Sequence, residues 1–204
     1  MTSWVTNQYE SVCSALKNED IFTVLPAGKW RNVCYQLPAL KSCATTVVLM
    51  PQLAYVEYFS IPAFFFLNQP TLTVAGTVSA DDLLVKIKEA RLLYITYMDF
   101  HRHKSLFKEI SQQGQIVRFV LDDAHFLSQW HEQGHVRYAK AVENLRQDFP
   151  SIPITALTAI PNERIYLDIL HLLGIHTHCK VYKQSILFYC WPFLSSWLIT
   201  CAMI

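Results

Sequence analysis

The stretch DIFTVLPAGKWRNVCYQLPAL, residues 20–40, begins as a short apolar run, passes through a loop and ends in the pattern of a helix. A second stretch, VLDDAHFLSQW at residues 120–130, ends another apolar run with two adjacent aspartates. A strand, a loop and a helix start, paired with a later strand that ends in carboxylates, is the layout of a phosphate-loop nucleotide site. Taken alone, Asp122 and Asp123 are as typical of a helix N-terminus, but the first loop favours the nucleotide site.

Short apolar runs alternate with amphipathic stretches through the first 180 residues. The predicted strands are residues 20–26, 45–50, 71–74, 92–96, 116–121 and 152–158. These runs are continuously apolar, which favours strands that are covered on both faces. Helical periodicity lies between them, at residues 79–90, 103–111, 137–149 and 162–173, and Ser79 is the predicted N-cap of the first of these helices. Strand and helix in alternation predict an α/β fold with a doubly wound parallel sheet, whose ligands bind beyond the carboxyl ends of the strands.

The length and the composition of the chain limit the class of protein to which it can belong. The 204 residues suffice for one domain, and 52% hydrophobic with 16% charged residues indicates a core-rich globular chain. A net charge of +1 gives no electrostatic footprint for nucleic acid. None of the six cysteines has C-x-x-C spacing, and the N-terminus lacks the pattern of a secretory signal, so we expect reduced thiols in an intracellular protein.

The last twenty residues differ from the rest of the chain. Residues 185–204 carry no charge and reach the length of a membrane span, although Pro192 and the serines at 195 and 196 weaken that interpretation. A tail anchor and an apolar extension that is buried, disordered or produced by altered coding sequence stay open as alternatives. We therefore divide the sequence into a lobe at residues 1–184 and an uncharged apolar tail at residues 185–204.

The stretch SQWHEQGHVRY, residues 128–138, contains the H-E-x-x-H spacing of zinc proteases at His131, Glu132 and His135. That spacing works when both histidines share one helix face and a third ligand completes the metal site. Gly134 disfavours the helix, and no third ligand can be identified from the sequence. A zinc protease is therefore the lesser alternative.

The two stretches quoted first resemble the RecQ family of DNA helicases, Bloom-type members especially. The family writes them as LPTGGGKSLCYQLPAL and DEAHCxSQWGHDFRPDY, and FPSIPITALTAI at residues 149–160 is similar to its FPxVPxxALTAT segment. The resemblance extends from about Gln8 to Ser185. It implies one RecA-like lobe of an ATP-dependent 3′ to 5′ DNA helicase of the nucleus, with ATP, Mg²⁺ and DNA as ligands. The H-E-x-x-H histidines then fall in the loop that couples DNA contact to ATP turnover, where they are incidental.

The resemblance also implies roles for individual residues. Gln8 stands where the family reads adenine, Asp122 where it holds magnesium, and Asp123 where a glutamate orients the attacking water. Arg31 stands at the catalytic lysine, and Asn32 at the serine that ligates magnesium. The implied phosphate-loop residues are Gly28, Lys29, Trp30, Arg31 and Asn32, and those that couple to nucleic acid are His125, Gln129 and Trp130.

Departures from the family pattern predict impaired catalysis. Lys29 and Trp30 replace glycines whose backbone must approach the phosphates, and the planar Arg31 fork is not equivalent to a compact ammonium. The Asp123 carboxylate is one methylene shorter, about 1.5 Å, than the family glutamate, and a misplacement of about 1 Å costs on the order of 100-fold in rate.

The sequence ends before the second helicase lobe of the family, so the chain alone is expected to be a weak or inactive enzyme. The alternative functions are a non-catalytic protein that binds nucleic acid or a helicase partner, and a pseudogene-like product. The alternative location is attachment to a membrane through residues 185–204.

Overall fold

One parallel sheet forms the centre of the molecule. The computed structural model describes residues 7–25, 29–51, 71–74, 79–132, 136–143 and 145–183. The strands are β1 (Ile21–Val24), β2 (Thr45–Met50), β3 (Thr71–Val74), β4 (Leu92–Thr96), β5 (Ile116–Leu121), β6 (Ile154–Thr158) and β7 (Lys180–Lys183). They pair in the order β3-β4-β2-β5-β6-β1-β7, and every pairing is parallel. This sheet confirms the predicted α/β fold.

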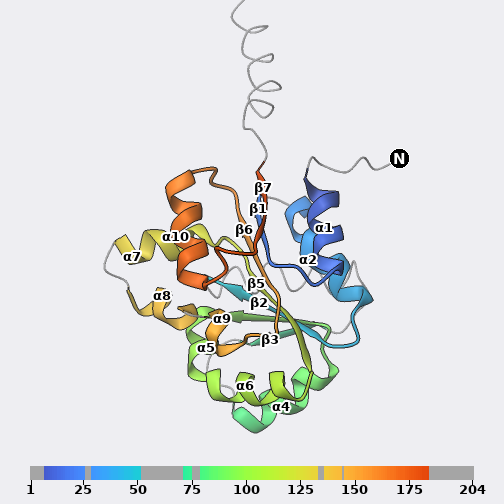
Figure 1. Cartoon of the computed structure of the whole chain (residues 1–204). Helices are drawn as coiled ribbons and strands as arrows, with labels where there is room; N and C mark the ends of the chain where they lie inside the picture. The colour runs from blue at the N-terminus through green and yellow to red at the C-terminus, as the bar shows by residue number, and fades with distance from the viewer. Residues whose placement is uncertain are drawn as a thin grey trace, which may run out of the picture.

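Helices cover both faces of the sheet. They are α1 (Gln8–Leu16), α2 (Lys29–Lys41), α4 (Ala80–Glu89), α5 (Tyr97–Arg102), α6 (Lys104–Gln112), α7 (His125–Glu132), α8 (Val136–Val142), α9 (Leu145–Asp148) and α10 (Glu163–Leu173). In Figure 1, α1 and α2 lie together on one side of the sheet, and α7, α8 and α10 lie on the other. The described part of the chain is therefore a three-layer lobe of the doubly wound type.

The continuous apolar runs are explained by two cores, one on each face of the sheet. Successive side chains of a strand point to opposite faces, so Val47 and Leu49 of β2 join one core while Val48 and Met50 join the other. The first core includes the Phe100 ring, which packs against the rings of Phe107 and Phe119, and the second core lies under α2. A central strand with both faces buried has no solvent side to carry polar residues.

Helix ends follow the predicted capping chemistry where the sequence carries it. The Ser79 hydroxyl accepts a hydrogen bond from the Asp82 N–H at 3.2 Å, which confirms the predicted N-cap of α4. Gly174 follows α10 with φ of +72°, a left-handed conformation that glycine adopts at low cost. Residues 137–149, predicted as one helix, instead form part of α8 and the short α9.

The sequence did not predict β7, which is the last strand of the sheet. Its four residues alternate little in hydrophobicity, and three of them are exposed. Lys183 lies 3.8 Å from the centre of the Tyr166 ring and 3.9 Å from a Glu163 carboxylate oxygen, so β7 contacts the beginning of α10. A short, charged edge strand gives no apolar run for sequence reasoning to detect.

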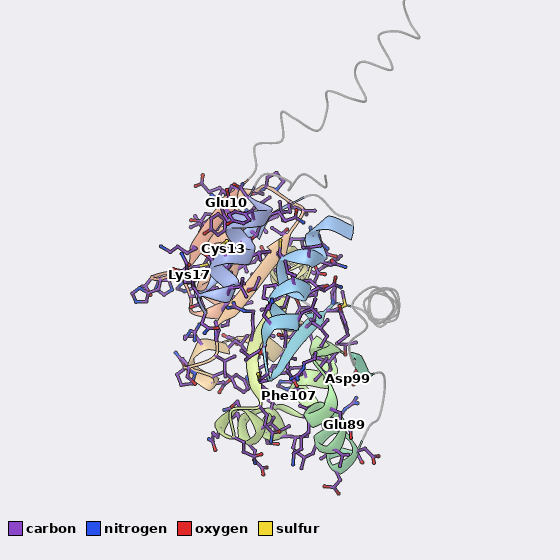
Figure 2. The ribbon with its side chains drawn as sticks, turned by 90° about the vertical axis from the view of Figure 1, so that its right-hand side faces the viewer. Glu10, Cys13, Lys17, Glu89, Asp99 and Phe107 are labelled. Atoms are coloured by element: carbon purple, nitrogen blue, oxygen red, sulfur yellow. The ribbon has the colours of Figure 1, made fainter. Side chains whose placement is uncertain are left out.

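A buried arginine fixes the end of α1 against the sheet. Arg118 of β5 is 3% exposed, and its guanidinium donates hydrogen bonds to the Ala15 carbonyl at 2.7 Å and the Thr155 hydroxyl at 2.9 Å. Burial lowers the pKa of Arg118 to about 10. Figure 2 shows Glu10, Cys13 and Lys17 following one another along the outer side of α1. The anchored helix begins at Gln8, which is buried.

The uncharged segment at residues 185–204, predicted to stand apart from the lobe, lies outside the described residues. Within the part of the chain that the structure describes, no helix is both long and apolar enough to cross a membrane.

Candidate functional site

A tight turn after β5 holds two carboxylates at the carboxyl edge of the sheet. The Asp122 N–H donates to the Leu49 carbonyl of β2 at 3.1 Å, and the Ala124 N–H donates to the Leu157 carbonyl of β6 at 2.8 Å. Between them, Asp123 has φ of +52°, in the left-handed region that aspartate tolerates better than most residues. Strands on both sides thus fix the backbone that carries Asp122 and Asp123.

Arg31, in the first turn of α2, bridges these two carboxylates. Its Nη2 lies 2.8 Å from Asp122 Oδ1, and its Nη1 lies 2.8 Å from Asp123 Oδ1. The side chain of Arg31 is 2% exposed and that of Asp122 is 0% exposed, so solvent does not screen the first pair. The structure therefore brings together a predicted phosphate-loop residue and both predicted carboxylates.

Burial and charge oppose each other within this group. Burial raises the pKa of Asp122 to about 6, although the Arg31 guanidinium acts to lower it, and the neighbouring Asp123 carboxylate also raises it. Burial acts to lower the pKa of Arg31, but the two carboxylates outweigh it and the pKa is raised. Burial outweighs the attraction of the single guanidinium, and the second carboxylate adds to its effect, so Asp122 accepts a proton more readily than an ordinary aspartate does.

His125 links the same turn to the end of β6. Its Nδ1 is 3.2 Å from the Thr158 hydroxyl oxygen and 3.9 Å from Asp123 Oδ1. Burial lowers the pKa of His125, and the Asp123 carboxylate opposes that shift. Of the other two predicted coupling residues, Gln129 lies half-buried on α7, and the Trp130 side chain lies outside the described residues.

Tyr35 belongs to the site, and sequence reasoning missed it. Its hydroxyl donates to Asp122 Oδ2 at 3.4 Å, and its ring packs edge-on against Tyr94 at a centroid distance of 6.5 Å. Burial raises the pKa of Tyr35 well above its ordinary value, so the phenol remains a proton donor. Tyr35 follows Arg31 by four residues, the spacing that places two side chains on one helix face, and that spacing was the available signal.

The remaining predicted nucleotide residues are described only in part. Gly28 and the side chains of Lys29 and Trp30 lie outside the described residues, and Gln8 is buried at the start of α1. Asn32 is 6% exposed, and its Oδ1 has no hydrogen-bond partner among the described residues. Within the described part of the chain, Asn32 Oδ1 is therefore a buried acceptor whose hydrogen bond is not made.

The carboxylates do not fit a divalent cation as they stand. Magnesium requires oxygen ligands in near-octahedral geometry at roughly 2.1 Å. Here Asp122 Oδ1 and Asp123 Oδ1 are each already paired with a guanidinium nitrogen, which has no lone pair to offer a metal. The turn as it stands is therefore not arranged to hold a catalytic metal ion.

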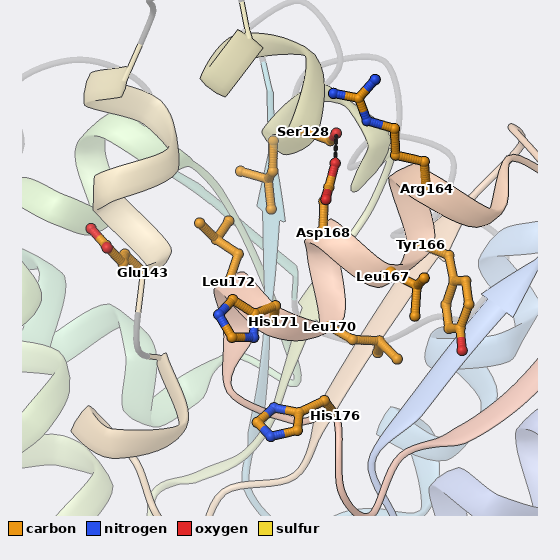
Figure 3. A pocket seen from close by; sticks show the side chains of 11 residues that line it. Ser128, Glu143, Arg164, Tyr166, Leu167, Asp168, Leu170, His171, Leu172 and His176 are labelled. Atoms are coloured by element: carbon orange, nitrogen blue, oxygen red, sulfur yellow. Dashed lines mark hydrogen bonds between the residues drawn. The ribbon is translucent and has the colours of Figure 1, made fainter.

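A separate hollow of about 740 Å³ lies between α7 and α10, and its lining includes Ser128, Asp168, His171 and His176. Figure 3 shows the hydrogen bond from the Ser128 hydroxyl to the Asp168 carboxylate, 3.0 Å long, on one side of it. The residues around Arg31 do not line this hollow. The zinc-protease alternative falls on residues 131–135, whose side chains lie outside the described part of the chain.

Comparisons with known proteins agree on one class. No protein-family model matches the sequence. The chain is 34% identical to the RecQ-like DNA helicase BLM of Xenopus laevis over 194 residues, which are 88% of this chain and 14% of that protein. It is 29% identical to the ATP-dependent helicase SGS1 of Saccharomyces cerevisiae, over 83% of this chain and 12% of that protein. The chain thus spans a small part of the length of these relatives.

Solved structures share the fold. The DUF1998 helicase MrfA, in a crystal structure bound to DNA, has a TM-score of 0.66 and 17% identity, and the match covers 88% of this chain and 27% of that one. At this identity the likeness shows the fold alone.

Proposed function

Because this chain carries the N-terminal lobe of a RecQ-type helicase, we propose that it acts as a helicase ATP-binding lobe whose capacity to hydrolyse ATP is impaired. The observation that carries the proposal is the Arg31 bridge to Asp122 and Asp123. DNA as the partner is proposed because the relatives are DNA helicases by name, and the nucleus as the location is proposed from the resemblance to this family.

The bridge withdraws both carboxylates from ATP chemistry. Hydrolysis in this class needs one carboxylate that holds the metal with the phosphates and a second that orients water. Asp122 and Asp123 instead each form an ion pair with Arg31 through one carboxylate oxygen. The Arg31 guanidinium is turned toward these carboxylates and is therefore not available to bind a phosphate. The shorter side chain of Asp123 adds a second obstacle, because its carboxylate cannot reach as far as glutamate.

A non-catalytic role is the second candidate, and the same bridge favours it. A lobe whose buried carboxylates are paired with an internal guanidinium does not need a nucleotide-bound metal ion to neutralise them. Such a lobe would serve as a binding module for nucleic acid or for a helicase partner. The two candidates differ in one measurable property, which is whether the chain binds ATP.

The test measures ATP affinity by calorimetry with Mg²⁺ present, and ATP hydrolysis with and without single-stranded DNA. We expect weak or no ATP binding by the wild type and no hydrolysis above background. A variant with Lys29→Gly, Trp30→Gly, Arg31→Lys and Asn32→Ser should bind ATP more tightly, because it regains a flexible loop, a compact ammonium and a hydroxyl.

Arg91→Lys in the wild-type chain is the matched control, because Arg91 precedes β4 at the amino edge of the sheet, hydrogen-bonds to the Cys43 carbonyl, and should leave ATP affinity unaltered. DNA-stimulated hydrolysis by the wild type would show that the proposed impairment is wrong. Unchanged ATP affinity in the fourfold variant would show that the nucleotide site has been misplaced.

A further inference from the structure

We propose that the Arg31 guanidinium is a built-in cation that takes the place of a divalent metal ion at the Asp122–Asp123 turn, so that this site is closed to metal. The inference rests on the proposed function, since it explains how the impaired site is kept closed. It concerns metal binding in the absence of nucleotide, a property that the proposed function leaves undetermined.

Geometry makes the guanidinium and a metal mutually exclusive. Arg31 spans two oxygens that belong to different residues, Asp122 Oδ1 and Asp123 Oδ1, at 2.8 Å each. A divalent ion shared by the same two oxygens would lie about 2.1 Å from each, within a few ångströms of both guanidinium nitrogens. Two cations at that separation in a buried site repel each other strongly. One of them must leave.

Burial favours the Arg31 guanidinium over a metal ion at this position. Its side chain is 2% exposed, so leaving would mean opening the packing at the start of α2. The Asp122 side chain has no exposure, and Asp122 Oδ1 also accepts the Asp123 N–H at 3.0 Å, so this oxygen is already satisfied. A metal would have to displace a buried ion pair and lose most of its own water shell.

The surrounding groups offer no other cation to the carboxylates. Tyr35 contributes a hydroxyl, and His125 Nδ1 lies 3.9 Å from Asp123 Oδ1 but 3.2 Å from the Thr158 hydroxyl oxygen, which is its nearer partner. Among the described residues, Arg31 is therefore the positive charge within contact distance of Asp122 and Asp123. If Arg31 is removed, two carboxylates are left facing one gap, and Asn32 Oδ1, which is buried and has no hydrogen-bond partner within the described ranges, belongs to the next residue.

The experiment titrates Mn²⁺ alone, without nucleotide, into the full chain and follows free Mn²⁺ by electron paramagnetic resonance. The wild type should show no stoichiometric site up to about millimolar Mn²⁺, the weak end of protein sites for hard cations. Arg31→Met should gain one site, with affinity at least about tenfold higher than any wild-type binding. Arg31→Met combined with Asp122→Asn should lose it again. Arg118→Met, which removes a buried arginine that hydrogen bonds to carbonyl and hydroxyl oxygens, should gain none.

The wild-type titration decides the matter even if Arg31→Met does not fold. A stoichiometric Mn²⁺ site in the wild type that Asp122→Asn abolishes would overturn the inference, and so would a folded Arg31→Met protein without a new site. These outcomes are distinct from failure of the proposed function, because that failure appears as DNA-stimulated ATP hydrolysis by the wild type and no ATP is present here.

Discussion

Replacing Arg31 with methionine should destabilise the lobe strongly at neutral pH. The substitution keeps an unbranched apolar stem but leaves Asp122, which has no exposed side-chain surface, and Asp123 without their cation. Removing one partner of a buried ion pair costs about 3–5 kcal/mol. Because domains of this size are stable by roughly 5–15 kcal/mol, this loss is a large part of the free energy of unfolding.

The penalty should depend on pH, and the sign follows from Asp122. Its folded pKa is about 6, above the ordinary 3.8, so its contribution to stability is fully present below pH 3.8 and is lost as the pH rises through 6. Without Arg31 only the weaker effects of the Asp123 N–H and the Tyr35 hydroxyl oppose burial, so the folded pKa of Asp122 rises further and the loss extends to higher pH. His125 acts in the same direction, because Arg31 lowers its pKa in the wild type. The variant should therefore lose least near pH 5, where Asp122 is largely protonated in both proteins.

Urea unfolding at pH 5 and pH 7.5 measures the effect. The difference between wild type and Arg31→Met should be several-fold larger at pH 7.5. Arg118→Met is the matched control, because the hydrogen bonds of that guanidinium go to the Ala15 and Glu19 carbonyls and the Thr155 hydroxyl, which do not titrate. Its penalty should be similar at both values. Equal losses for Arg31→Met at the two pH values, or a larger loss at pH 5, would refute the reasoning.

Two further predictions concern the surroundings of the site and the end of α10. Tyr35→Phe removes a hydroxyl 3.4 Å from Asp122 and should cost about 1 kcal/mol or less in urea unfolding; a loss comparable with that of Arg31→Met would mean that the phenol, and not the guanidinium, is the main partner of Asp122. Gly174→Ala should cost about 1–2 kcal/mol, because φ is +72° and the new Cβ would lie 3.3 Å from Arg146 Cβ. Gly114→Ala, at φ of +71° in open space, is its control, and a control that loses as much as Gly174→Ala would show that crowding contributes nothing.

Most of the fold could be predicted from the sequence, because its signals are local. The continuous apolar runs at β2 and β5 indicate strands buried on both faces, and the structure places both in the middle of the sheet. The edge strand β7 escaped notice because exposure on its sides removes the apolar run. The division between α8 and α9 escaped notice because helical periodicity continues across residues 143 and 144.

The sequence predicted which residues belong to the site, but not which of them form ion pairs with one another. The sequence predicted that Arg31 binds phosphate and that Asp122 holds a metal ion, whereas in the structure these two side chains form an ion pair with each other. Which partner a buried charge finds depends on where the first turn of α2 meets the turn after β5, and no local pattern encodes that meeting. Tyr35 was within reach of the sequence, because its spacing from Arg31 puts both on one face of α2.

The lysines of β7 bear on how copies of this lobe meet. A terminal strand presents a row of backbone donors and acceptors that another chain can extend, and charged side chains along it discourage such an extension. Lys180 and Lys183 make up half of β7 and are exposed to a large degree. Two lobes that approached edge to edge through β7 would bring their lysines close together. The repulsion between these like charges disfavours edge-to-edge association into fibre-like stacks.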